Sequence, residues 1–168
     1  YVYSTGLTHL GSAMLTEAVG ASTREFGREH LFEPMGISVP RWDGSPEGYD
    51  FGGAEMWMRP RDLARFGQVF LDGGVADGEQ VLSPVWVAES ANPWVPEAGG
   101  RTYGLWWRER PWDNYPANDS YFGWGWGGQF VFIFPTMDLV VVVNSKWQVD
   151  GNVSGATANA IFAAVDAG

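Results

Sequence analysis

The sequence of 168 residues lacks cysteine and contains very little lysine and histidine. Without cysteine the chain cannot form disulfides, bind a metal through thiolates or use a cysteine nucleophile. The one lysine, Lys146, has Val143 three positions before it, so no Ser-x-x-Lys motif occurs. Apolar runs such as Leu139 to Val143 are far too short to cross a bilayer, so the sequence predicts no membrane span in this chain.

Positive charge is also scarce, because ten Lys and Arg stand against twenty Asp and Glu and give a net charge of −10. Phosphate backbones and anionic lipid repel so acidic a chain, and we therefore expect no nucleic-acid partner. The acidic residues are scattered rather than clustered, so no metal site is predicted, and no cofactor is expected either. His9 and His30 fall inside predicted helices, where packed or surface positions are expected rather than ligands or bases.

The chain begins at Tyr1 without an initiator methionine or a signal peptide. We interpret it as a piece of a longer protein, so the compartment (periplasmic, secreted or cytoplasmic) stays open. With 45% hydrophobic and 18% charged residues, the composition is that of a globular protein. Its length is sufficient for one domain with a core.

Apolar spacing and capping signals predict several helices. Apolar residues recur at helical spacing over residues 7–18, and Gly20 is a candidate C-cap. Ser22 and Glu25 form a capping box that opens a second helix, which we expect to end near Phe32. The other predicted helices are Asp62 to Leu71, a short one opened by Ser83 and Pro84, and an Ala-rich one from Val153 to Val165.

Short β-prone runs rich in Val, Phe and Trp occupy the second half of the chain. Residues 36–59, by contrast, are rich in Gly, Pro and Asp and predict a long loop. Helices followed by strands and a last helix indicate an α+β fold with an antiparallel sheet. Three strands would leave an open edge, so we expect the sheet to be incomplete in this chain. The predicted strands are Tyr103 to Glu109, Gln129 to Phe134 and Leu139 to Ser145.

A glycine-rich string from Gly123 to Gly128 formally satisfies the G-x-G-x-x-G pattern. That fingerprint binds dinucleotides only with a strand before it and a helix after it. Here a predicted strand follows instead, so we reject nucleotide binding. Two interpretations remain for the alternating glycines: a close approach of a ligand to the backbone, or room for two Trp rings against the sheet.

Short motifs form an ordered set along nearly the whole chain. They are Tyr3 to Gly6 with Leu10, Gly11 and Gly20; Leu31 to Gly36; Met58 to Gly67; Leu71 to Gly74; Tyr103 to Trp107; Gly127 to Gln129; and Pro135 with Asp138 to Val142. Each motif is weak alone. As a set, their order resembles that of the β-lactamase-related serine hydrolases, which include class C β-lactamases, penicillin-binding proteins, esterases and aminohexanoate-oligomer hydrolases.

This resemblance implies an antiparallel sheet flanked by helices, with the active site between the sheet edge and a helical lobe. It also implies an acyl-enzyme mechanism, in which the serine of Ser-x-x-Lys attacks a carbonyl and water later releases the acyl group. Tyr3 matches the tyrosine of the second motif and is expected to act as general base and acid. Because the nucleophile motif is missing, residues 1–168 are expected to be the C-terminal part of one domain, inactive without its N-terminal remainder.

The resemblance also implies a substrate class. Thr5 stands where class C enzymes carry Asn, and Trp124 stands where the third motif usually has a cation. Both differences favour a small-molecule ester or amide over a penicillin-type substrate. Gly125, Trp126 and Gly127 match the oxyanion strand, where the Trp126 N–H is the expected donor and the glycines give access to the backbone. The many Trp residues suggest an apolar acyl pocket, with core packing as the alternative.

Three other functions stay open. A D-amino-acid peptidase or β-lactamase acting on cell-wall-like substrates would need a basic pocket, which Arg59, Arg61 or Arg101 could supply. A degenerate relative would have lost activity. A Trp-rich carbohydrate-binding module would repeat Trp on one sheet face, whereas Trp106 and Trp107 are adjacent in the sequence and would point to opposite faces of a strand.

Overall fold

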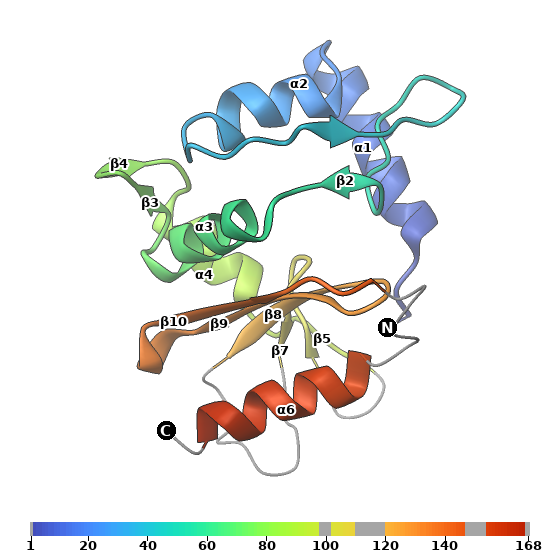
Figure 1. The fold of residues 1–168 in the computed structure, drawn as a ribbon. Helices are drawn as coiled ribbons and strands as arrows, with labels where there is room; N and C mark the ends of the chain where they lie inside the picture. The colour runs from blue at the N-terminus through green and yellow to red at the C-terminus, as the bar shows by residue number, and fades with distance from the viewer. Residues whose placement is uncertain (1, 98–101, 110–119, 147–153, 167–168) are drawn as a thin grey trace.

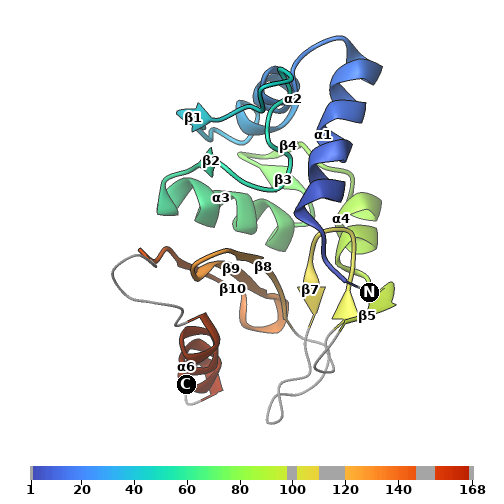
Figure 2. The ribbon, with the colours of Figure 1, turned by 90° about the vertical axis from the view of Figure 1, so that its right-hand side faces the viewer.

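The computed structural model describes residues 2–97, 102–109, 120–146 and 154–166. Within these residues a six-stranded antiparallel sheet lies between the C-terminal helix on one face and a helical layer on the other (Figures 1 and 2). The predicted α+β class and the antiparallel pairing are confirmed. The strand order is β10-β9-β8-β7-β6-β5. The strands are β5 (Val95–Pro96), β6 (Thr102–Tyr103), β7 (Arg108–Glu109), β8 (Tyr121–Gly125), β9 (Gln129–Phe134) and β10 (Leu139–Val143).

The expected number of three strands is wrong, because one predicted strand is divided and both β8 and the two-residue β5 were not predicted. The run predicted as one strand from Tyr103 is divided into β6 and β7, because Trp106 adopts a left-handed φ of 77° and turns the chain. Strand β8 escaped prediction because Gly123 and Gly125 lower its β propensity. Its ladders with β7 and β9 supply the backbone hydrogen bonds that the local sequence does not favour.

The helices follow their capping signals closely. Gly20 ends the first helix in the left-handed conformation, as predicted, and Ser4 caps its start, which was not predicted. The capping box of Ser22 and Glu25 is formed, although the segment behind it continues as a π-helical turn. The helices are α1 (Thr5–Val19), α2 (Thr23–Gly27), η1 (Arg28–Phe32), α3 (Pro60–Leu71), α4 (Pro84–Ala91), the 3₁₀ turn η2 (Pro135–Met137) and α6 (Ser154–Asp166). Two short strand pairs, β1 (Arg41–Trp42) with β2 (Met56–Trp57) and β3 (Val75–Ala76) with β4 (Glu79–Gln80), lie outside the main sheet.

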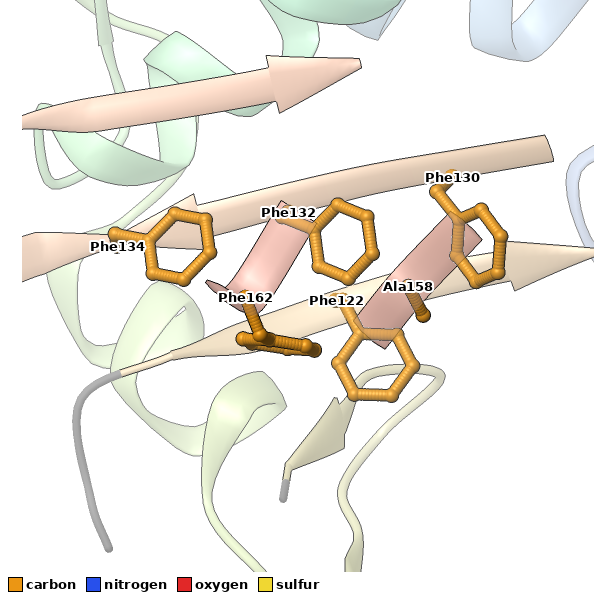
Figure 3. Packing of buried hydrophobic residues seen from close by; sticks show 6 residues of the cluster. All are labelled: Phe122, Phe130, Phe132, Phe134, Ala158 and Phe162. Carbon is orange, nitrogen blue, oxygen red and sulfur yellow. The ribbon is translucent and has the colours of Figure 1, made fainter. Parts of the chain in front are cut away.

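The face of the sheet toward α6 is packed with phenylalanine (Figure 3). Alternate residues of β9 point to this face, so Phe130, Phe132 and Phe134 form a ladder with ring centroids 5.1 and 6.2 Å apart. Phe162 of α6 meets Phe132 edge-on at 5.3 Å. Burial of each such ring contributes roughly 2–3 kcal/mol, which attaches the C-terminal helix firmly to the sheet.

The opposite face packs against α3. Val131 and Ile133 of β9 are buried there with Phe70 of α3, and Trp107 stands edge-on to Phe70 at 4.8 Å. Gly67 allows this close approach, since a Cβ at that position would lie 2.7 Å from Cγ1 of Val140 on β10. Helix α3 therefore sets the distance between the helical layer and the sheet.

Helix α1 has its polar face inward. Thr8 and Ser12 are buried, whereas Leu7, Leu10 and Met14 are more than half exposed. These three residues, at helical spacing, are called the α1 apolar stripe below. Ser12 Oγ donates to the carbonyl of Asp50 at 2.7 Å, so polar contacts hold the helix. Among the described helices, none combines the length and apolarity that a membrane crossing requires.

Candidate active site

Tyr3 lies in the extended segment that leads into α1, directly before the N-cap Ser4. It is 37% exposed. The guanidinium carbon of Arg108 lies 5.5 Å from the centroid of the Tyr3 ring, within the range of a cation–π contact. This contact joins the start of the chain to strand β7.

Arg108 is the centre of an aromatic cluster. Its guanidinium carbon also lies 5.1 Å from the Tyr103 ring and 5.5 Å from the Trp124 ring. Its Nε donates to the carboxylate of Glu97 at 3.2–3.3 Å. The side chains of Arg108 and Glu97 are only 11% and 9% exposed, so the ion pair is nearly buried. Tyr3 and Trp124, far apart in sequence, thus meet at one cation.

The glycine-rich turn between β8 and β9 follows Trp124 directly. Gly127 and Gly128 have φ values of 77° and 87°, which glycine adopts without strain. Trp126 is 79% exposed at the tip of the turn. Because strands flank this turn on both sides, the dinucleotide fingerprint is excluded, as predicted.

Two side chains brace the turn, Gln129 at the start of β9 and Ser145 just after the end of β10. Gln129 donates through Nε2 to the carbonyl of Ser145 at 2.6 Å and accepts from the Ser145 N–H at 3.2 Å. The Ser145 hydroxyl in turn donates to the carbonyl of Gly127. The orientation of the peptide groups around Gly127 is therefore fixed by side chains as well as by the ladder.

The predicted site residues divide into two groups. Tyr3 and Trp124 come together at Arg108, and Gly125, Trp126 and Gly127 continue from Trp124 along the same strand and turn. Thr5 opens α1 two residues after Tyr3, and its methyl carbon lies against the loop at Gly53, where a Cβ would come within 3.1 Å of it.

Sequence reasoning missed Arg108 and Glu97. A signal was present, because Arg108 is a charged residue inside an aromatic, β-prone run, where a buried partner is to be expected. Its partner could not be identified from sequence, because Glu97 lies across strand β6 and not at a helical or hairpin spacing.

An apolar cavity of about 300 Å³ opens between α4, the β6–β7 turn and β8. Trp86, Leu105, Trp106 and Trp107 line it together with Gly123. Trp107 is core packing as well, because it is 6% exposed and stacks 6.2 Å from Phe66. Trp106 is 56% exposed at the cavity wall. Trp106 thus lines an apolar cavity, and Trp107 both lines it and packs in the core, whereas the predicted acyl pocket stays a prediction.

The remaining candidates lie away from this region. His9 contacts the Phe51 ring at 5.3 Å and His30 the Phe26 ring at 4.5 Å, both in the helical layer. Arg59 and Arg61 are exposed at the start of α3, and Arg101 lies outside the described residues. In the part of the chain that is described, no three His, Asp or Glu side chains gather as metal ligands would.

Comparison with known proteins finds the following relatives. A 6-aminohexanoate-dimer hydrolase from Paenarthrobacter ureafaciens is 33% identical over 111 residues, which are 60% of this chain and 27% of that protein. A structure described as a candidate 6-aminohexanoate-dimer hydrolase from Bacillus anthracis superposes with a TM-score of 0.76 at 21% identity, covering 95% of this chain and 42% of the other. A penicillin-binding protein homologue from Caulobacter crescentus gives 0.65 at 16% identity, covering 81% and 50%.

The two superposed structures share the fold of the sheet and helical layer. The chain spans half or less of the length of each of the three relatives. The family model for β-lactamase matches residues 2–165, which is almost the entire sequence. The chain therefore belongs to the β-lactamase family.

Proposed function

We propose that this chain is the C-terminal part of a serine hydrolase that cleaves small amides or esters through an acyl-enzyme. The observation that carries the proposal is the meeting of Tyr3 and Trp124 at the guanidinium of Arg108, each ring 5.5 Å from it. Tyr3 is the general base and acid, and the turn after Trp124 supplies an oxyanion donor through the Trp126 N–H.

Within this proposal, Tyr3 carries out the proton transfers. Tyr3 accepts the proton of the attacking serine and later returns it to the leaving amine or alcohol. A free tyrosine has a pKa near ~10, so the phenolate needs nearby positive charge, and the lysine of Ser-x-x-Lys is its expected source. Arg108 lies over the Tyr3 ring and holds the side chain in place.

The nucleophile must come from residues outside this chain, because Lys146 has no serine three positions before it. The α1 apolar stripe supports this part of the proposal. Leu7, Leu10 and Met14 are 66%, 53% and 64% exposed on the helix that follows Tyr3. Burying three such side chains against an N-terminal segment would contribute several kcal/mol, at roughly 1.5–3 kcal/mol each.

Amides with linear aliphatic parts are the favoured substrates within this proposal. The similarity to 6-aminohexanoate-dimer hydrolases supports an amide bond. Trp124 in place of a cation removes a charge that would bind a carboxylate at this position of the third motif. Arg59 and Arg61 are exposed at the start of α3 and neither lines the apolar cavity, so a cell-wall peptidase is less favoured.

The test uses the parent protein, expressed from the natural reading frame upstream of Tyr1. We expect that frame to encode Ser-x-x-Lys and the protein to hydrolyse p-nitrophenyl butyrate and the 6-aminohexanoate linear dimer. Tyr3→Phe should lower kcat/KM by about 10²–10⁴. Tyr49→Phe is the matched control, because Tyr49 donates to Glu17 near the end of α1 opposite to Tyr3 and should leave the rate unchanged. Intact mass measured during turnover should detect the acyl adduct. A Tyr3→Phe rate within twofold of wild type would contradict the proposal.

A further inference from the structure

The cavity beside β8 has the properties of a binding subsite. Its volume is about 300 Å³, at the small end of ligand pockets, and its wall is almost entirely apolar. Gly123 forms part of the floor, where a Cβ would lie 3.1 Å from Cγ1 of Val131 and 3.8 Å from the Trp107 ring. Without a side chain at this position, the space above the strand stays open.

One wall is held in a strained conformation. Leu105 and Trp106 form a two-residue turn closed by the hydrogen bond from the Gly104 N–H to the Trp107 carbonyl at 2.8 Å. Trp106 has a φ of 77°, at a turn position that usually carries Gly or Asn. A bulky residue held there is a signal of function, because such strain persists only where surrounding contacts impose it.

The contacts that impose this strain come from the end of α4. The Leu105 N–H donates to the Ser90 carbonyl at 2.8 Å, and Ser90 is 1% exposed. Gly104 packs so closely on this helix end that a Cβ would lie 2.8 Å from the Asn92 carbonyl oxygen. The turn is therefore fixed at two points, and the Trp106 side chain is held at the cavity wall although it is 56% exposed.

The position of the cavity relates it to the proposed oxyanion turn. Gly123 and Gly125 are alternate residues of β8, so they face the same side of the sheet, about 7 Å apart. A substrate whose carbonyl lay at Trp126 could therefore place an adjoining chain or ring over Gly123. A charged group would find almost no polar partner in the cavity.

We propose that this cavity binds the neutral apolar part of the substrate, an unbranched alkyl chain or a single aromatic ring, with Trp106 as the specificity-determining wall. Its role in turnover rests on the proposed hydrolase function. The binding itself does not, because every residue of the cavity belongs to this chain.

The test measures binding of acetamide, butanamide, hexanamide and octanamide to the 168-residue chain by tryptophan fluorescence titration. If each methylene is buried, affinity should rise about fourfold per CH₂ up to the length that fills the cavity. Trp106→Gly should remove most of this increase, while its Tm stays equal or rises because glycine accepts the left-handed φ. Trp86→Ala gives a second variant of the wall.

Trp57→Ala is the matched control, because Trp57 is 54% exposed and lies on β2, outside the cavity. It should keep the wild-type dependence on chain length. Affinity independent of chain length, or Trp106→Gly and Trp86→Ala both binding like wild type, would overturn the proposal. A parent protein that hydrolyses no amide or ester, combined with the expected binding series, would instead reject the proposed function and leave the subsite in place.

Discussion

Arg108 and Glu97 form an ion pair at 3.2 Å across strand β6, and each side chain is only about one-tenth exposed. The stacked rings of Tyr103 and Trp124 beside the guanidinium remove water from the pair. Two opposite charges inside an acidic protein are thus kept at a point where three aromatic residues meet. A buried pair of this kind fixes the positions of the side chains around it more than it stabilises the fold, because desolvation offsets much of the attraction between the charges.

Removing one partner should therefore be costly. Glu97→Gln leaves the Arg108 charge nearly buried and unpaired, and we expect a loss of about 3 kcal/mol in the free energy of unfolding, measured with urea. The control is Glu33→Gln in the ion pair with Arg28, where both side chains are more than half exposed. That variant should change stability by less than about 1 kcal/mol. Equal losses in the two variants would contradict the burial argument.

Two glycine-to-alanine changes in helices should have opposite signs. Gly67→Ala places a methyl group 2.7 Å from Val140 and 3.0 Å from Val131, and both valines are fixed in the sheet. Overpacking should exceed the gain in helix propensity and destabilise the protein by about 1–2 kcal/mol. Gly11→Ala in α1 meets nothing within 4 Å, so it should stabilise by about 0.5–1 kcal/mol. Thermal and urea unfolding of both variants checks the pair.

The brace of the β8–β9 turn gives a test of positioning. Gln129→Glu keeps the acceptor for the Ser145 N–H but loses the donor to the Ser145 carbonyl, whereas Gln129→Ala loses both. We expect amide exchange of Trp126 to Gly128 to quicken from wild type to Glu to Ala. In the parent enzyme kcat should fall in the same order with KM nearly constant, because the substrate pocket is untouched. A change in KM alone would contradict the positioning role.

Alkaline pH should weaken the core through Tyr121. Burial raises the pKa of Tyr121 to about 12, against 10.0 for the free side chain. The folded state holds this proton more tightly, so stability is complete below pH 10 and falls as the pH rises toward 12. After allowance for partial exposure, the loss is about 1–2 kcal/mol. Tyr121→Phe should lack this loss when the free energy of unfolding in urea is compared between pH 9 and pH 11.5. An equal change between the two pH values in both proteins would refute the prediction.

How much of the fold could be predicted from the sequence depends on whether the interactions that determine each element are local. The caps at Ser22 and Gly20 are local, so α1 and α2 could be placed well. Strand β8 could not, because its glycines are tolerated only through pairing with two neighbours. The division of residues 102–109 depends on a single left-handed residue, Trp106, which no propensity scale favours there.

The candidate site has the same limit. Motif order located Tyr3 and the segment from Trp124 to Gly127, because these residues are adjacent in sequence or match a known pattern. Arg108, which joins them, acts through three-dimensional proximity and belongs to no motif. The exposure of the α1 apolar stripe could not be predicted either, because the helical spacing of apolar residues defines a face but not what that face contacts.

The inward polar face of α1 has a consequence for how the chain opens. Ser12 holds this helix through directed hydrogen bonds to Asp50 and Thr23, so separating it from the loop at Asp50 uncovers little apolar surface. The free energy of such a local opening should hardly depend on urea, because the denaturant slope follows the surface exposed. Opening of α6, held by the Phe132 and Phe162 rings, should depend on urea steeply. Hydrogen exchange measured across a urea series should then show an opening free energy that hardly changes with urea for α1 and falls steeply with urea for α6.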